Sequence, residues 1–208
     1  MKAGLCLLLA CLAAAVQAAP PVTSLQLLEE RPVAGMTNGN LSGLTWCQGA
    51  LWAVSDRDDR RLYRLHAAPG IWQAEAENFS APVAPPSGLS WGQQIGSWGV
   101  GIVRGGELDF EGLSCDAAGN RYLVSEAQVA VLKLPLDGSP NWLPLPPNLL
   151  GQARVSGLFR QFNALAEGLA VDPAGKRLWL AAERQNRGLI ALQQQTGGWA
   201  CAQSCVLL

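Results

Sequence analysis

An all-β fold is predicted by the composition of the sequence and by a pattern that occurs three times along it. The 208 residues include 23 Gly, 13 Pro and 8 Trp, whereas charged residues make up only 15%. This mix is typical of short strands joined by tight turns. The recurring unit is a strand, a turn containing glycine, and a second strand, which is the pattern of a β-hairpin. Hairpins repeated at long intervals predict a small β-propeller, whose blades are sheets of about four strands.

The three predicted hairpins span 41–56, 110–126 and 166–183. Their turns contain Gly49, Gly119 and Gly175, and further strands are expected at 61–65, 129–134 and 188–192. The repeats begin with Ser42-Gly43-Leu44, Glu111-Gly112-Leu113 and Glu167-Gly168-Leu169, which lie 69 and then 56 residues apart. A blade takes about 40–50 residues. We therefore expect either an extra blade or long insertions between the repeats, and about five blades in all, within a range of four to six.

Two stretches between the hairpins are harder to assign. Ser87-Gly88-Leu89-Ser90-Trp91 resembles the start of a repeat and is interpreted either as a degenerate blade or as a loop before a strand at 101–103. A single short helix is expected within 154–166. A β-sandwich is the competing fold, although it does not require the repeat. The length after the leader favours one domain over 19–208.

Residues 1–18 have the pattern of an export signal. Lys2 supplies a positive start, 5–12 form a short apolar stretch, and Val16-Gln17-Ala18 fits a cleavage site. The apolar stretch is shorter than the roughly 20 residues of a membrane span. A second interpretation is a lipoprotein signal with Cys11 acylated. Both predict a periplasmic or secreted protein.

The charge balance limits the partners. The chain has 15 basic and 16 acidic residues and no basic run. Nucleic-acid binding is therefore not expected. We expect a monomer without a membrane span.

Four cysteines follow the predicted leader: Cys47, Cys115, Cys201 and Cys205. Four cysteines in an exported chain permit three pairings. We expect a disulfide between Cys201 and Cys205, which would close a small loop near the C-terminus. The sequence leaves open whether Cys47 and Cys115 are paired. A zinc site is not expected, because the only histidine, His66, lies far away in the sequence.

Acidic side chains recur at the predicted open ends of the hairpins. Antiparallel pairing symmetric about each turn places Glu111 opposite Glu126, Glu167 opposite Glu183, and Ser42 opposite Asp56. If these hairpins are the inner strands of blades, their open ends face one mouth of the central channel. The metal-site candidates are Asp56, Glu111, Glu126, Glu167 and Glu183. Calcium suits such a site because it takes several oxygen ligands in loose geometry.

A structural role is the alternative for each of these carboxylates. A glutamate at the end of a strand can remain solvated, or it can accept hydrogen bonds from the backbone of the next blade. Asp116 and Asp172 begin Asp-x-x-Gly turns, so we expect them to cap local amides.

Several motifs together resemble one family. They are Ser55-Asp56-Arg57, Asp109-Phe110-Glu111-Gly112-Leu113, Ala166-Glu167-Gly168-Leu169-Ala170 and Ala182-Glu183-Arg184. Taken together they resemble the esterase-like phytase (phytase-like) family of exported bacterial β-propellers. The Glu-Gly pattern is also similar to that of the gluconolactonase and paraoxonase group of calcium-dependent hydrolases. That similarity implies a metal-binding role for Glu111 or Glu167.

Two functions follow from these observations. The first is metal-assisted hydrolysis of an ester or phosphoester, with Glu111 and Glu167 as catalytic candidates and Arg57 and Arg184 binding the anionic group. No Gly-x-Ser-x-Gly or phosphate-binding glycine motif is present, and His66 is expected in a surface turn rather than in a catalytic triad. The second function is non-enzymatic binding of a small molecule, peptide or carbohydrate by a propeller whose carboxylates are structural.

Overall fold

The computed structural model describes residues 24–37, 39–161, 164–183 and 186–207. Arg31–Leu208 forms one compact unit, and Met1–Glu30 is a separate one. The predicted leader, 1–18, and Arg184 lie outside the described residues.

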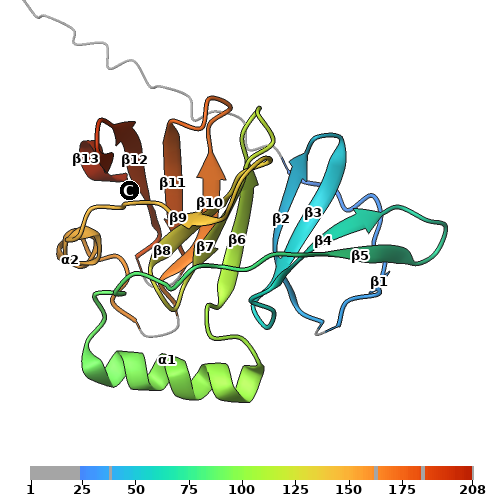
Figure 1. Ribbon diagram of the computed structural model, residues 1–208, viewed down its shortest axis with the longest axis horizontal. Helices are drawn as coiled ribbons and strands as arrows, with labels where there is room; N and C mark the ends of the chain where they lie inside the picture. The colour runs from blue at the N-terminus through green and yellow to red at the C-terminus, as the bar shows by residue number, and fades with distance from the viewer. Residues whose placement is uncertain (1–23, 38, 162–163, 184–185, 208) are drawn as a thin grey trace, which may run out of the picture. The chain divides into compact units, whose positions relative to one another are not determined.

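Three sheets make up the larger unit (Figure 1). The first has the order β1 (Val33–Ala34), β5 (Trp72–Asn78), β4 (Arg61–His66), β3 (Ala50–Ser55) and β2 (Leu41–Cys47). The second has the order β6 (Phe110–Cys115), β7 (Arg121–Ser125), β8 (Ala130–Leu134) and β9 (Asn141–Trp142). The third has the order β10 (Ala166–Val171), β11 (Arg177–Ala182), β12 (Gly188–Gln195) and β13 (Gly198–Leu207).

Each sheet is an antiparallel meander of four consecutive strands, which is the topology of a propeller blade. Only β1, which pairs in parallel with β5, departs from it. The predicted all-β fold of propeller type and the positions of its three hairpins are confirmed. The described residues form three blades, however, rather than the five expected. The intervals between repeats contain α1 and irregular connections instead of further sheets.

The blades pack face to face through their first strands, β2 on β6 and β6 on β10. Two buried clusters fill the interfaces. Val54 and Leu62 of the first sheet meet Phe110, Leu113 and Leu123 of the second. A larger cluster joins the second sheet to the third and to α2. The core of the unit therefore lies between its blades.

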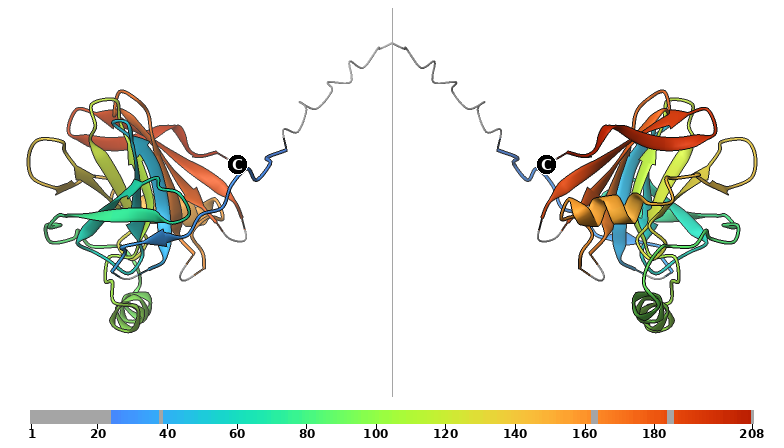
Figure 2. Two further views of the ribbon diagram at one scale, coloured as in Figure 1. Left: turned by 90° about the vertical axis from the view of Figure 1, so that its right-hand side faces the viewer. Right: turned by 90° about the vertical axis from the view of Figure 1, so that its left-hand side faces the viewer.

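Two helices connect the blades. Helix α1 (Trp91–Arg104) precedes β6 and lies outside the sheets, at the end where β6 begins (Figures 1 and 2). It occupies the stretch interpreted above as a degenerate blade or a loop, and the strand expected at 101–103 is helical. The side chain of Gln93 caps the first turn, because its Oε1 accepts a hydrogen bond from Ser90 N at 3.3 Å. Helix α2 spans Leu149–Val155, whereas the sequence predicts a helix within 154–166. The observed helix lies earlier in the chain because its apolar residues Leu149, Leu150 and Ala153 pack into the core.

Glycines allow the first strands of neighbouring blades to approach closely. A Cβ atom on Gly43 would lie 2.8 Å from Leu113 N, and one on Gly112 would lie 2.8 Å from Leu169 N. Real Cβ atoms essentially never come so close to backbone. Gly43 and Gly112 are therefore required by the contact between blades, and not by a turn.

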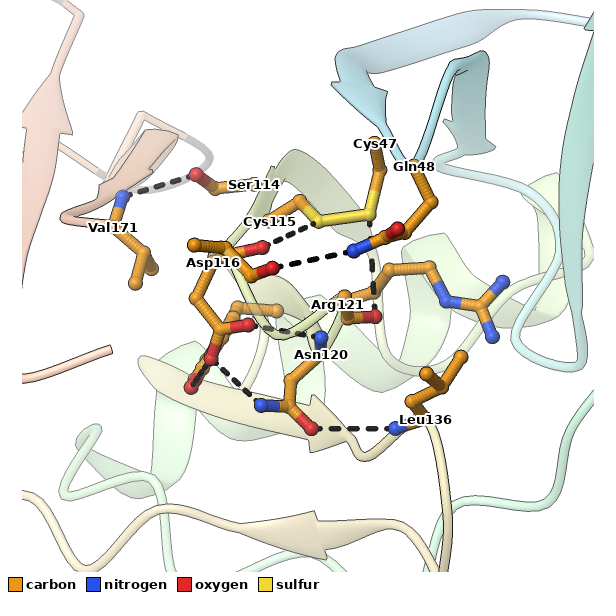
Figure 3. Close-up of a disulfide and its surroundings, with 12 residues drawn as sticks. Cys47, Gln48, Ser114, Cys115, Asp116, Asn120, Arg121, Leu136 and Val171 are labelled. Atoms are coloured by element: carbon orange, nitrogen blue, oxygen red, sulfur yellow. Dashed lines mark hydrogen bonds between the residues drawn. A yellow bond between two sulfur atoms is a disulfide. The ribbon is translucent and has the colours of Figure 1, made fainter. Parts of the chain in front are cut away.

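A disulfide also crosses the interface of the first two blades (Figure 3). Cys47 at the end of β2 is bonded to Cys115 at the end of β6, with 5.7 Å between their Cα atoms. The neighbouring Gln48 Nε2 donates to Ala117 O at 3.3 Å. Between the second and third blades, Ser114 Oγ accepts a hydrogen bond from Val171 N at 3.0 Å. Cys201 and Cys205 form a second disulfide, within β13.

No helix in the described residues has the length and apolar character needed to cross a membrane.

The glycine contact gives a first prediction. Gly112→Ala should lower the free energy of unfolding by about 1–3 kcal/mol, because overpacking displaces the facing strand. Chemical denaturation followed by circular dichroism measures the change. Gly99→Ala in α1 is the matched control, since a Cβ there meets nothing within 4 Å, and it should be neutral or stabilising. Equal stability of Gly112→Ala and the wild type would contradict the proposed constraint.

Candidate functional site

A β-bulge occurs at the same position in all three repeats. The register shifts between Leu41 and Gly43, between Phe110 and Gly112, and between Ala166 and Gly168. The additional residues are Ser42, Glu111 and Glu167, each directly before the repeated glycine. A bulge re-aims the side chain of the additional residue and bends the strand. All three bulges lie where the first strand begins, at the open end of the hairpin.

Three carboxylates meet at this end of the first and second blades. Asp56, which follows β3, Asp109, which precedes β6, and Glu111, on the bulge, each have an oxygen atom within 4.8 Å of the others. Asp56 is 6% exposed, and Glu111 is half-buried. The cluster therefore combines groups from two blades whose sequence positions differ by more than 50 residues.

Glu126 adjoins this cluster and connects it to the third blade. It is buried, and its Oε1 accepts a hydrogen bond from Leu165 N at 2.7 Å. Its own N–H donates to Asp109 O at 2.9 Å, and its carboxyl group shares a hydrogen bond with that of Asp109. Part of the role of Glu126 is therefore structural, as the alternative interpretation of the carboxylates expects.

Glu167 lies close enough to raise the pKa of both Glu111 and Glu126 through its charge. Glu183 is exposed and lies outside the trio of Asp56, Asp109 and Glu111. Arg57 is the nearby cation, with its Nε 4.0 Å from Asp56 Oδ1 and its side chain 47% exposed.

Burial and mutual repulsion dominate the electrostatics of the cluster. Burial is the main cause that raises the pKa of Glu111 to about 8, and the charges of Asp109, Glu167, Asp56 and Glu126 add to it in that order. Burial likewise raises the pKa of Glu126, against the lowering effect of the hydrogen bond from Leu165. Carboxylates gathered in this way retain protons or bind a cation near neutral pH.

One oxygen atom, Asp56 Oδ1, indicates that a cation would fit the acidic cluster. Asp56 Oδ1 exposes less than 1 Å² and accepts no hydrogen bond from a described residue. A buried carboxylate oxygen without a donor is costly unless a cation or water completes it. Carboxylate oxygens are the ligands that calcium prefers. The residues present therefore suit a hard divalent cation.

The structure corrects the predicted pairing of the acidic residues. The bulges shift the register, so that Phe110 pairs with Ser125 and Ala166 with Ala182. Glu111 and Glu167 thus have no direct partner across the hairpin, and Asp109 lies beside Glu126 instead. Asp109 is a member of the cluster that symmetric pairing of the hairpin does not predict. Its φ of +53° is a conformation that Asn and Asp tolerate best, and Asn40, at the same repeat position, has a φ of +73°.

The segment after α1 is held against the same end of the first blade. Asp59 accepts hydrogen bonds from Glu107 N at 2.6 Å and Leu108 N at 3.0 Å. Gly106 lies against Asp56, since a Cβ there would be 2.7 Å from the Asp56 carbonyl oxygen. These contacts fix the backbone that carries Asp109. By contrast, a pocket of about 380 Å³ between 85–88 and 143–150 contains no titratable side chain.

Comparison with known families assigns the chain. The family model described as "Phytase-like: Esterase-like activity of phytase" matches residues 36–198, which is more than three quarters of the sequence. The chain belongs to this phytase-like family. The match includes strands β2 to β12 and every member of the acidic cluster, and it confirms the resemblance noted in the sequence. A search of curated proteins finds no match to this phytase-like chain.

Two of the solved structures that match the chain are those of lyases. Virginiamycin B lyase from Staphylococcus aureus matches with a TM-score of 0.39 and 12% identity, over 74% of this phytase-like chain and 41% of its own length. A streptogramin B lyase matches with a TM-score of 0.41 and 14% identity, over 80% of this chain and 55% of its own. The chain thus spans about half the length of these proteins.

The raised pKa values predict a pH dependence for the phytase-like protein in the presence of a chelator. The pKa of Glu111 rises from the ordinary value of 4.5 to about 8 on folding. Between these values the folded state binds more protons than the unfolded state, so stability should decrease as the pH rises from 4.5 to about 8. Thermal unfolding in EDTA at a series of pH values measures this. Glu111→Gln should flatten the decrease, whereas an unchanged slope in that variant would refute the assignment.

Proposed function

We propose that this protein is a divalent-cation-dependent hydrolase of carboxylic or phosphoric esters, with calcium as the cation. Its ligands in this proposal are Asp56, Asp109 and Glu111. The observation that carries the proposal is the buried Asp56 Oδ1, which accepts no hydrogen bond from a described residue and lies within 4.8 Å of two further carboxylates. Membership of a family described by its esterase-like activity supports the reaction class.

The side chains around the cluster have separate roles in this proposal. A bound calcium ion would polarise the phosphoryl or carbonyl oxygen of the ester. Arg57, partly exposed beside Asp56, donates hydrogen bonds to the anionic group of the substrate. Glu126 holds Asp109 in place through their shared hydrogen bond. Glu167, on the bulge of the third blade, acts as general base for the attacking water.

We also propose that the protein is exported. The two disulfides support this, since such bonds persist in oxidising compartments. The N-terminal 18 residues have the pattern of an export signal, as described above.

Calcium should raise the thermal stability of the wild-type protein above that in EDTA. A ligand that binds only the folded state adds about 2.7 kcal/mol at a hundredfold excess over its Kd. Asp56→Asn and Glu111→Gln should each lose most of the calcium effect, because each removes one charged ligand. Differential scanning calorimetry with calcium and with EDTA measures it.

Glu183→Gln is the matched control, because it removes an exposed carboxylate outside the trio. It should retain the full calcium effect. Repulsion without a specific site would instead make Asp56→Asn and Glu111→Gln more stable in EDTA and leave all variants with the same weak response to calcium. That outcome would overturn the metal site.

Hydrolysis of chromogenic phosphate and carboxylate esters tests the activity itself. We expect turnover in calcium that is lost in EDTA and reduced at least tenfold in Glu111→Gln, while Glu183→Gln remains active. A calcium effect on stability without turnover of either substrate class would reject the hydrolase and favour the non-enzymatic binding function, in which the cation is structural.

A further inference from the structure

The repeated leucine after each glycine is buried in the second blade, partly buried in the third and exposed in the first. Leu113 is 4% exposed, and Leu169 packs against the cluster between the second and third blades. Leu44, at the same repeat position on β2, is 54% exposed. The difference has a simple cause. Leu113 and Leu169 each have a preceding blade to pack on, whereas no sheet in the described part of the chain precedes β2.

The repeated glycines show that a contact is also missing on the third blade, at the other end of the row of blades. Gly43 packs on Leu113 N, and Gly112 packs on Leu169 N. A Cβ on Gly168 would meet within 4 Å only the Cβ of Ala181, in its own sheet. Among the described residues, no strand lies against Gly168 as β6 and β10 lie against the other two glycines. The contact between a repeated glycine and the next blade therefore joins the first blade to the second and the second to the third. In the described residues, it is absent before the first strand of the first blade and after Gly168 of the third.

We call the exposed side of β2 the leading face; it carries Leu44 and Trp46, the latter 70% exposed. Val33 and Met36 cover the outer part of this sheet, so the exposed part is its first strand. We call the outer side of the third sheet the trailing face. It carries a shallow depression of about 380 Å³ lined by Gly168, Leu169, Ala170, Trp179, Ala181 and Leu189.

We propose that two copies of this chain close a six-bladed ring, with the leading face of each copy on the trailing face of the other. Each copy has one face of each kind. The two interfaces inside the chain already join a leading side to a trailing side through the same repeat positions, so a second copy continues an existing contact. A Leu44 side chain from the partner would then have an apolar surface to cover, as Leu113 and Leu169 have.

The number of blades selects the dimer. Propellers have about 4–8 blades, and three blades fall below this range. Two copies give six, whereas three copies give nine. The two contacts between the copies would be identical and related by a two-fold axis that runs along the central channel, so the assembly would have closed symmetry. The sequence predicts a monomer, and the exposed faces of the three blades are the reason to replace that expectation.

The dimer also affects the acidic cluster, although it does not depend on the proposed function. A two-fold axis along the central channel keeps the mouths of both copies on the same side of the ring. Glu167 would then lie next to the first blade of the partner, which carries a second Asp56. The channel mouth would thus contain two acidic clusters.

The mass of the full chain in solution, measured by light scattering after gel filtration, tests the proposal. We expect twice the chain mass of 22.0 kDa, less the leader if it is cleaved. Leu44→Glu and Leu189→Glu, on the two faces, should each give a folded monomer. Both residues are exposed, at 54% and 40%, so the fold of one copy should tolerate the changes. Circular dichroism checks that it does.

Ile102→Glu is the matched control, because Ile102 is 59% exposed on α1. It should remain a dimer. A wild-type monomer at all concentrations would overturn the proposal, as would a dimer that Ile102→Glu dissociates and Leu44→Glu does not. A monomer would also leave the faces to another occupant, such as further blades in a longer chain or a different protein.

A cross-link tests the geometry and does not rely on loss of assembly. Cys47 and Cys115 lie four and three residues after the repeated glycines of consecutive blades, and they form a disulfide. The equivalent positions across the proposed interface are Asp172, four residues after Gly168, and Trp46, three residues after Gly43. A chain carrying both Asp172→Cys and Trp46→Cys should form a covalent dimer on a non-reducing gel.

Each single substitution serves as a control and should stay uncross-linked. Asp172→Cys also removes the acceptor of the hydrogen bonds from Lys176 N and Arg177 N, at 2.6 and 2.9 Å. The free energy of unfolding of this single variant therefore measures how much stability these bonds contribute. A dimer by mass whose double variant forms no cross-link under oxidising conditions would mean that the copies associate through other surfaces, and it would refute the ring.

Discussion

The close approach of neighbouring first strands is the constraint on which this structure depends. With no side chain at Gly43 or Gly112, the backbone of one blade rests on that of the next. Hydrogen bonds then form directly between them, including the one from Ser42 Oγ to Phe110 O at 2.6 Å. The same approach brings the beginnings of β2, β6 and β10 together. The bulge residues and the aspartates beside them can therefore meet, although the chain separates them widely.

The sequence predicts the regular part of the fold well and the connections poorly. The hairpins turn at Gly49, Gly119 and Gly175 as expected, because glycine at positive φ marks the turns and apolar strands flank them. Helix α1 was missed, since its many glycines and exposed tryptophans do not have the pattern of a helix packed on a core. The sequence predicts too many blades, because a long interval between repeats is compatible with an extra blade as well as with an insertion, and the described residues contain insertions there.

At the candidate site, the sequence predicts which end of each hairpin carries the acidic groups but not how they pair. The ladder next to the turn pairs Gly112 with Val124, so even without a bulge Glu111 would lie opposite Ser125 rather than Glu126. The additional residue at Glu111 then removes that partner and shifts the pair beyond it. That shift brings Asp109 into the cluster. Glu183, predicted opposite Glu167, lies exposed beyond the end of β11. Bulges are set by tertiary contacts at the end of a sheet, and the spacing of residues in a single sequence does not show where they occur.

The disulfide between Cys47 and Cys115 makes the intervening 67 residues a covalently closed loop. That loop includes the outer strands of the first blade and the whole excursion through α1. Cleavage of the backbone within the excursion would leave two fragments that remain joined and packed. Changes in its length would likewise cost little, since the entropy of closing a loop grows only with the logarithm of its length. The segment through α1 is thus the part of this protein that can be cut, extended or replaced while its first two blades stay in register.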